Sequence, residues 1–416
     1  MDESRKIEDL LQVLDITRRL AVTPDLESLL LRIEEAALGV LDCERATVYV
    51  HDPVTDELVS RVATGLRELR FPADRGIAGE CFRTGEVILV EDAYADPRFN
   101  RAVDKETGFR TRNILTCPLT RHDGGSVGVL QVLNKTAESF SPWDETLLLT
   151  LGAQCGVALQ RQALLSEFAG KQRIQRELSI AREIQQGLLP REPLVITGVE
   201  VAGRSHPAQE TGGDFYTWQR VAGERHVVTL ADVSGHGVSA ALVAAQCHAL
   251  LRSAFSSLPA GKGVASAVDI VSGLLREDIP EDRFVTLVSV LIDRGGRGLR
   301  VCSAGHGPLL LFRSGGGPIE LPVHAMPLGI EPLAITSEER VDLEPGDCLV
   351  LLTDGLLERR SPAGEPFGIE GVSRVVHTLG CATATEIVTG LHLAAAVHAR
   401  GSEPRDDLTV VVLLGT

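Results

Sequence analysis

Four aspartates each interrupt or end an apolar, strand-like run beside small residues. They occur in the segments GGDFY, ADVSGHG, LLTDG and RDDLT, as Asp214, Asp232, Asp354 and Asp406. A carboxylate at the end of a buried strand is costly unless it is paired or binds a cation. No Lys or Arg lies within two positions of the first three. The pattern therefore indicates a cation supplied from outside the chain.

Oxygen-only ligands of this kind select hard ions, Mg²⁺ or Mn²⁺, over zinc or copper. Two such ions about 4 Å apart can share a bridging water, lower its pKa and clamp a phosphoryl oxygen. This chemistry hydrolyses a phosphate ester without a covalent intermediate. A single Asp-Gly pair is usually just a turn. Four aspartates in matching contexts, in this order, favour a metal site instead.

The elements that must position these carboxylates begin after Pro193, where the chain becomes a strand-rich α/β sequence. Apolar runs predict strands at 198–205, 213–219, 226–233, 285–293, 299–304, 308–313, 347–353 and 407–414. Helical spacing predicts helices at 238–255, 264–277, 368–378 and 383–399. Short hairpins, such as the one around Gly295-Gly296, indicate mostly antiparallel sheet.

Residues 180–414 resemble the metal-dependent phosphatases of the protein phosphatase 2C (PPM) family, in the bacterial branch typified by SpoIIE and RsbU. The resemblance is carried by eight segments in order, AREIQQGLLP at 181–190, TGGDFY at 211–216, 231–242, FVTL at 284–287, SAGHGP at 303–308, PGD at 345–347, TDGLLE at 353–358 and DDLT at 406–409. It implies an α-β-β-α sandwich of antiparallel sheets and a serine/threonine phosphatase that uses two Mn²⁺ or Mg²⁺ ions and a metal-bridging hydroxide.

The resemblance also implies roles for individual residues. Asp232 would bridge both metals, Asp214 and Asp354 would bind one each, and Asp406 would complete the cluster. The carbonyl group of Val233 would add a backbone ligand, and Asp407 is a weaker substitute for Asp406.

Two positions depart from the family pattern. Thr217 replaces a second aspartate that often binds a further metal. Ser234 stands where the wider family has a histidine that can protonate the leaving group, and His236 is off register. We therefore name no general acid, and we expect His306 to be structural.

The N-terminal part resembles a GAF domain across about 22–165. Its most specific piece is the set Asn134, Lys135, Phe140, Asp144 and Glu145, which matches a motif of GAF domains that bind cyclic nucleotides. Lys135 and Asp144 are placed to pair between the last strand and the following helix, where acidic residues suit the helix N-terminus.

This motif has two interpretations: it locks helix to sheet, or it marks a domain that binds cAMP, cGMP or another small molecule. We expect ligand contacts from residues 75–79 and from the 91–113 loop, whose 91–111 part shows no regular pattern. Around them, we expect helices at 5–20, 25–41 and from 142, and strands at 46–51, 58–63, 87–90, 114–119 and 126–133, with a hairpin turn at 122–125.

Residues 154–189 form one helical stretch that ends at Pro190 and Pro193. Within it, a stripe follows the alternating four-three spacing of a coiled-coil seam, through Ile174, Leu178, Ala181, Gln185 and Leu188. The helix could pack on its own domain, but its place between two domains favours a dimeric signalling linker. We therefore expect a homodimer.

The resulting α+β chain has an N-terminal helix at 1–21, a GAF domain at 22–160, a helical linker at 161–192 and a phosphatase domain at 193–416. A net charge of −16 without a Lys/Arg block argues against nucleic-acid binding. No basic amphipathic stretch, signal peptide or apolar run of about 18 residues points to a membrane, so we expect a cytoplasmic protein. The 8 scattered cysteines are expected to be core thiols.

These observations favour a signalling phosphatase whose substrate is a phosphorylated regulator, such as an anti-sigma-factor antagonist. The GAF domain would act through the linker helix. A catalytically inactive protein that binds phosphoproteins or senses nucleotides is the alternative, and a small-molecule phosphatase is a second one.

Overall fold

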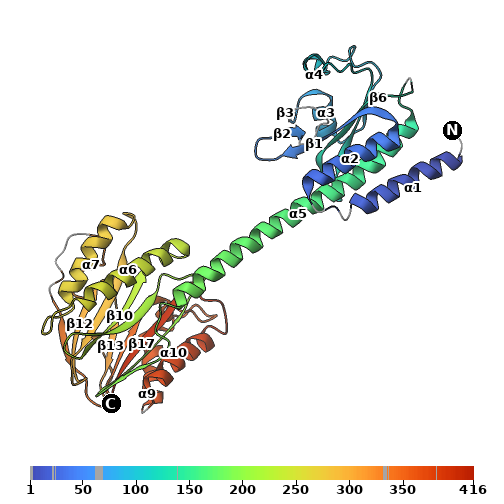
Figure 1. Cartoon of the computed structure of the whole chain (residues 1–416). Helices are drawn as coiled ribbons and strands as arrows, with labels where there is room; N and C mark the ends of the chain where they lie inside the picture. The colour runs from blue at the N-terminus through green and yellow to red at the C-terminus, as the bar shows by residue number, and fades with distance from the viewer. Residues whose placement is uncertain are drawn as a thin grey trace. The chain divides into compact units, whose positions relative to one another are not determined.

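The computed structural model describes residues 3–20, 23, 25–60, 69–137, 139–330, 335, 337–380 and 382–416. The chain divides into two compact units, Met1–Arg173 and Ile174–Thr416 (Figure 1). Each unit has its own sheets and its own buried core, so each is described by itself.

The first unit is built on a six-stranded antiparallel sheet in the order β3-β2-β1-β6-β5-β4. Its strands are β1 (Cys43–Asp52), β2 (Glu57–Ser60), β3 (Leu69–Pro72), β4 (Ile88–Val90), β5 (Ile114–Thr120) and β6 (Ser126–Lys135). The predicted hairpin joins β5 to β6, and the N–H of Arg121 donates to the carbonyl oxygen of Gly125 at 2.7 Å.

Helices cover both faces of this sheet. On one face lie α2 (Leu26–Leu41) and the first part of α5 (Pro142–Gln186), with α1 (Glu3–Leu20) packed beside α2. On the other face lies α3 (Gly76–Thr84), and α4 (Arg101–Thr107) follows β4. Asp25 caps α2, because its carboxylate accepts the N–H of Ser28 at 2.8 Å.

The second unit contains two antiparallel sheets. The five-stranded sheet has the order β15-β12-β11-β10-β9 and the six-stranded sheet has the order β14-β13-β16-β17-β8-β7. Their strands are β7 (Leu194–Ile196), β8 (Val199–His206), β9 (Phe215–Val221), β10 (Arg225–Val233), β11 (Val285–Ile292), β12 (Gly298–Ala304), β13 (Leu309–Phe312), β14 (Pro318–Leu321), β15 (Glu339–Asp342), β16 (Cys348–Leu352) and β17 (Leu408–Gly415).

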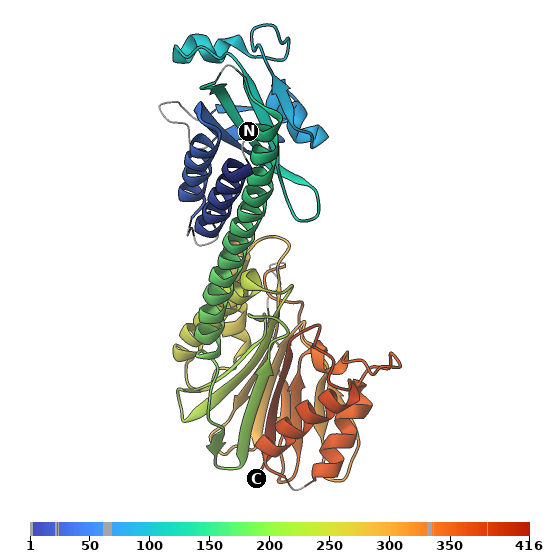
Figure 2. The ribbon, with the colours of Figure 1, turned by 90° about the vertical axis from the view of Figure 1, so that its right-hand side faces the viewer.

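The two sheets pack face to face between two pairs of helices (Figure 2). The helices α6 (Val238–Ser256) and α7 (Ala265–Asp278) cover the five-stranded sheet, and α9 (Gly368–Leu379) and α10 (Ala384–His398) cover the other. A single turn, α8 (Asp354–Leu357), follows β16. The expected α-β-β-α sandwich is confirmed.

The structure refines the sequence-based expectations in three places. The 91–111 stretch was expected to be irregular but contains α4, whose N-cap Asn100 accepts the N–H of Ala102 at 3.1 Å. The short strands β3, β7, β14 and β15 were not predicted, because three or four residues give too little alternation. Of the strand predicted at 58–63, the last three residues lie outside the described part.

Two further expectations concern composition. Within the described residues, α6 is the one helix long and apolar enough to cross a membrane. Its buried side chains, among them Val243 and Leu251, pack on the five-stranded sheet as a core helix does. Six cysteines are buried, which confirms them as core thiols, Cys43 is half-buried, and Cys381 lies outside the described residues.

Candidate active site and ligand pocket

The four predicted aspartates stand at strand ends that antiparallel pairing brings to one edge of each sheet. Asp214 comes just before β9 and Asp232 lies near the end of β10, where Ala231 pairs with Phe215. Asp354 follows β16 and Asp406 comes just before β17, where Leu352 pairs with Val410. Each sheet therefore contributes two of the carboxylates.

A hydroxyl group joins the two sheets at this edge. Thr353, which directly follows β16, donates its Oγ1 hydrogen to Oδ2 of the buried Asp214 at 2.8 Å. Oγ1 of Thr353 also accepts the N–H of Thr409 in β17 at 3.1 Å. Asp214, which belongs to the five-stranded sheet, is thereby held against the ends of two strands of the six-stranded sheet.

Asp407 organises the loop that carries Asp214. Its carboxylate accepts the N–H of Ala208 at 2.8 Å and the N–H of Asp214 at 3.3 Å. A Cβ atom on Gly212 would lie 2.2 Å from Oδ2 of Asp407, so only glycine allows this close approach. Asp407 is thus occupied by backbone groups, whereas the neighbouring Asp406 is exposed to solvent.

Mutual repulsion and burial raise the pKa of all four predicted ligands. Burial, followed by the charges of Asp354 and Asp406, raises the pKa of Asp232 to about 7. Burial and then the charge of Asp232 raise the pKa of Asp214 well above its usual value. The pKa values of Asp354 and Asp406 are raised as well, first by desolvation and then by neighbouring acidic side chains.

This donor set fits a hard divalent cation. Within the described residues, none of the four carboxylates forms an ion pair with Lys or Arg, so their repulsion is not offset by the chain itself. Nor do any three described His, Cys, Asp or Glu side chains stand close enough to form a ready-made metal site. The fit therefore rests on charge and on donor type. The carbonyl oxygen of Val233 faces the same loop, 2.7 Å from where a Cβ on Gly213 would lie.

His306 is a buried structural residue, as expected. Its Nε2 lies 3.1 Å from the carbonyl oxygen of Leu352, which can only accept, so Nε2 carries the hydrogen. Nδ1 then accepts from the Thr286 hydroxyl at 2.9 Å. Burial lowers the pKa of His306 to about 4, which keeps the ring neutral.

Three residues contact the loops around these aspartates although the sequence predicted no such role for them. Arg359 is buried and donates from Nη1 to the carbonyl oxygen of Glu403 at 2.7 Å, in the loop before Asp406. Arg283 contacts the turn after Asp232, and Gln185 contacts Gly212. All three bind backbone groups, and such contacts leave no spacing signal in a sequence.

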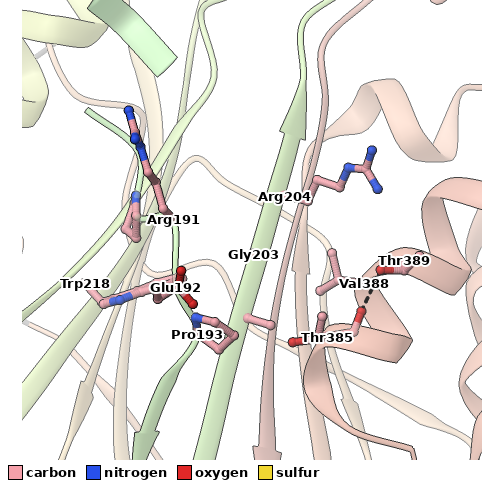
Figure 3. Close-up of a pocket in the computed structure, with 11 residues that line it drawn as sticks. Arg191, Glu192, Pro193, Gly203, Arg204, Trp218, Thr385, Val388 and Thr389 are labelled. Carbon is pink, nitrogen blue, oxygen red and sulfur yellow. Dashed lines mark hydrogen bonds between the residues drawn. The ribbon is translucent and has the colours of Figure 1, made fainter. Parts of the chain in front are cut away.

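A small cavity lies where the end of the linker meets the phosphatase-like sandwich (Figure 3). Its volume is about 160 Å³, and it is lined by Arg191, Glu192 and Pro193 together with residues of β8, Trp218 and α10. None of the four aspartates lines it, so it is not the reaction site. Nearby, the Tyr216 hydroxyl group contacts the carbonyl oxygens of Pro190 at 3.2 Å and Gly203 at 2.9 Å, which pins the linker end to β8.

The first unit contains a much larger pocket, of about 630 Å³, which is the size of a site for a small organic molecule. Its floor is formed by β1, β3 and β6, with Tyr49 and Phe71 among the lining residues. Its walls are residues 75–78 at the start of α3 and residues 97–100 of the loop after β4. These are the two segments from which ligand contacts were expected.

The five-residue GAF motif connects this pocket wall to α5. Asn134 accepts the N–H of Arg112 at 2.6 Å, which anchors the loop that leads from α4 to β5. Lys135 donates to Asp144 at 2.8 Å and to the carbonyl oxygen of Leu41 at 2.7 Å. Burial alone would raise the pKa of Asp144, but the bonds from Lys135 and Ser141 lower it. In the same motif, Phe140 is buried and Glu145 lies half-buried in the first turn of α5.

The stripe predicted on the linker helix is only partly exposed. The side chain of Gln185 is half-buried because it contacts Gly212 of the same chain, and Leu178, Ala181 and Leu188 are also half-buried. Ile174 is 59% exposed. Farther toward the N-terminus of α5, three exposed apolar side chains share one helix face, at Val157, Leu164 and Phe168.

Models of two known protein families match this chain, one in each of its two units. The model of the family described as Stage II sporulation protein E (SpoIIE) matches residues 222–414, and the model of the GAF domain matches residues 25–159. A curated relative, the probable 3',5'-cyclic phosphodiesterase of Caenorhabditis elegans, is 28% identical over 173 residues. That match covers 38% of this chain and spans 23% of the relative's length, less than a quarter of it.

Among solved structures, the SiaA-PP2C domain of Pseudomonas aeruginosa is similar with a TM-score of 0.52 and 21% identity, covering 60% of this chain and 99% of that domain. The RsbU and RsbW domains of a Mycobacterium tuberculosis protein are similar with a TM-score of 0.45 and 25% identity, covering 53% of this chain and 61% of that one. The first similarity supports the sandwich fold of the second unit.

Proposed function

Because the chain joins a GAF domain to a phosphatase domain of the SpoIIE family, we propose that it is a cytoplasmic, metal-dependent protein serine/threonine phosphatase controlled by a small molecule. The observation that carries this proposal is the cluster of four carboxylates. They come from both sheets to one edge, and their pKa values are raised by burial and by each other.

In this proposal Asp214, Asp232, Asp354 and Asp406, with the carbonyl of Val233, hold two Mn²⁺ or Mg²⁺ ions. When bound, such ions supply an activated water and neutralise charge on the phosphoryl group. The chain's own part is orientation. Thr353 fixes the carboxylate of Asp214, and Asp407 fixes the loop behind it.

The proposal is tested by hydrolysis of an aryl phosphate and of phosphoserine and phosphothreonine peptides, with Mn²⁺ or Mg²⁺. We expect metal-dependent turnover that Asp232→Ala abolishes. Asp342→Ala is the matched control, since that aspartate is exposed on β15 away from the cluster. A wild-type chain that binds phosphopeptide but shows no turnover with either metal would favour the catalytically inactive regulator instead.

The substrate in this proposal is a phosphorylated regulatory protein, of the kind represented by an anti-sigma-factor antagonist. The support is the SpoIIE family match of the second unit. Turnover of phosphopeptides should then exceed turnover of small phosphorylated metabolites. Equal turnover of both would favour a small-molecule phosphatase.

The effector proposed for the GAF domain is an anionic molecule with a flat ring, such as cAMP or cGMP. Arg75 lies at the pocket beside the N-terminus of α3, and no described carboxylate pairs with it. Tyr49 and Phe71 offer aromatic surface, and the guanidinium of Arg45 stacks 4.0 Å from the ring of Phe109. The similarity to a cyclic-nucleotide phosphodiesterase also supports this class of ligand.

Calorimetric titration of the full chain with cAMP and with cGMP tests the effector. We expect Arg75→Ala to weaken binding about ten-fold, as loss of a charged contact does. Arg83→Ala, exposed in the last turn of the same helix, is the control and should bind normally. No binding of either nucleotide would exclude this class of effector.

The proposed dimer forms through α5, along the face of Val157, Leu164 and Phe168. These side chains are 47%, 58% and 60% exposed and are spaced by seven and four residues, as in a coiled-coil seam. Light scattering should show a dimer for the wild type and a monomer for Phe168→Glu. Ser166→Glu places the same charge on the opposite side of the helix and should leave the dimer intact.

Control of the phosphatase would pass along α5, which runs unbroken from the Lys135–Asp144 contact to Gln185. A chain that lacks residues 1–150 should then differ in rate from the full chain. An identical rate for the two chains, with and without each candidate ligand, would contradict this coupling.

A further inference from the structure

The turn between β10 and α6 directly follows the predicted ligands Asp232 and Val233. Its two glycines have no side chains that could stabilise the conformation of the turn. Gly235 and Gly237 both have positive φ, at +86° and +79°. Gly237 is the N-cap of α6 and has no side chain to accept the first N–H groups of the helix. The position of this turn must therefore be set by another part of the chain.

Residues 283 and 284, which lead into β11, supply that support. The N–H of Ser234 donates to the carbonyl oxygen of Phe284 at 3.0 Å, and the N–H of Phe284 donates to the Ser234 hydroxyl oxygen at 3.0 Å. These two bonds extend the β10–β11 ladder by one step beyond the pair formed by Val233 and Val285.

The guanidinium group of Arg283 spans the turn. Its Nη1 donates to the carbonyl oxygen of Ser234, and its Nη2 donates to the hydroxyl oxygen of Ser239 at 3.0 Å. A Cβ on Gly235 would lie 1.8 Å from Nη1, so the guanidinium rests directly on the turn. The fork thus connects the end of β10 to the first turn of α6.

Arg283 forms no ion pair with any described residue. Within the described residues, no carboxylate lies within 4.0 Å of its guanidinium nitrogens, although the chain has a net charge of −16. Arg283 is half-buried, and the directional hydrogen bonds to a carbonyl and a hydroxyl oxygen, rather than an ion pair, hold its guanidinium group in place. A lysine has a single nitrogen and cannot span the same two acceptors as a planar fork.

We propose that Arg283 is a positioning residue, which fixes the turn after β10 so that the Asp232 carboxylate and the Val233 carbonyl group face the bound cation together. This inference rests on the proposed metal-dependent function. It adds a residue from outside the acidic motifs, 51 positions after Asp232 in the chain, to the machinery of the site.

The test measures metal binding as well as turnover, in the full chain. Titration calorimetry with Mn²⁺ should show binding about ten-fold weaker for Arg283→Ala than for the wild type, the size expected when a charged hydrogen bond is lost. Arg283→Lys should not restore affinity. Ser239→Ala, which removes one of the two acceptors, should have a smaller effect in the same direction. Arg276→Ala, exposed on α7, is the control.

A merely structural role predicts a different result. In that case Arg283→Ala would lower the melting temperature in EDTA while its Mn²⁺ affinity stayed at the wild-type value, and the inference would be wrong. If Arg283 is a positioning residue, the Arg283→Ala variant should have a lower rate of turnover, and excess Mn²⁺ should largely restore that rate. Asp232→Ala provides the reference for a lost site. A wild-type chain that binds no Mn²⁺ would overturn both this inference and the proposed function, whereas unchanged binding by Arg283→Ala overturns only this inference.

Discussion

The side-chain amide of Gln185 binds both backbone groups of Gly212. Its Nε2 donates to the carbonyl oxygen at 2.6 Å, and its Oε1 accepts the N–H at 3.2 Å. Gln185 lies in the last turn of the long helix α5, and Gly212 lies two residues before Asp214 on the loop that Asp407 holds. The last turn of the linker is therefore in direct contact with the loop that supplies a predicted metal ligand.

Replacing Gln185 by alanine removes both of these bonds. We expect kcat/KM of the full chain to fall about ten-fold, because one to two kcal/mol of support for the Asp214 loop is lost. Gln186→Ala is the matched control, since that side chain is exposed one residue later. Steady-state kinetics with an aryl phosphate and Mn²⁺ measures both variants. Equal rates for the two would show that the contact does not influence the site.

The neighbouring carboxylates of Asp406 and Asp407 should respond to substitution in opposite ways. Asp406→Asn removes a charge that is repelled by Asp354, so the melting temperature in EDTA should rise slightly and the stabilisation by Mn²⁺ should decrease. Asp407→Asn turns an acceptor into a donor beside the N–H of Ala208 or Asp214, so the melting temperature in EDTA should fall.

Thermal melts with EDTA and with Mn²⁺ distinguish these outcomes. The reverse pattern, in which Asp407→Asn alone loses the Mn²⁺ effect without a loss of stability in EDTA, would make Asp407 the ligand in place of Asp406.

The Lys135–Asp144 pair should stabilise the first unit strongly. The Lys135 and Asp144 side chains are only 14% and 9% exposed, so Lys135→Met leaves a buried carboxylate without its cation. We expect a loss of about 3 kcal/mol in the free energy of unfolding of this unit. Lys105→Met, exposed on α4, should cost little.

The two tryptophans, Trp143 and Trp218, lie in different units, which allows this measurement in the full chain. In a Trp218→Phe background, the fluorescence of Trp143 reports denaturant unfolding of the first unit alone. A loss for Lys135→Met no larger than that for Lys105→Met would contradict a stabilising role for the pair.

Glu34 should make the stability of the first unit depend on pH. Its carboxyl group is buried on α2, and the N–H of Val48 at 3.3 Å is the one hydrogen bond that it accepts from the described residues. Burial raises its pKa to about 7. The folded state therefore favours the protonated form. Stability is highest below the ordinary pKa of 4.5, falls as pH rises toward 7, and then levels off.

Glu34→Gln removes this dependence while keeping an acceptor for Val48. At pH 8 the variant should be more stable than the wild type by up to about 3 kcal/mol, and at pH 4.5 the two should be equal. Unfolding followed through Trp143 at a series of pH values measures the difference. A difference that does not change with pH would show that Glu34 titrates normally.

Without a structure, the sequence indicated the families of both domains, four aspartates as candidate metal ligands and nearly all of the long elements. Strands such as β10 and β17 are continuous apolar runs, and helices such as α6 show helical spacing between clear turns. Apolar runs and helical spacing are local patterns, so they can be recognised in the sequence without a structure. Short hairpins also predicted the mostly antiparallel sheets.

The residues that support the loops around the four aspartates can be seen only in the folded chain. Asp407, Gln185, Arg283 and Arg359 bind backbone N–H and carbonyl groups that lie 27 to 199 positions away in the chain, or in loops with no pattern. Every residue carries the same backbone groups, so a contact with one of them leaves no mark at the partner position. Which carbonyl or N–H group a side chain contacts depends on the folded structure. The structure therefore distinguishes Asp407, whose carboxylate binds the loop before Asp214, from Asp406, which is exposed to solvent.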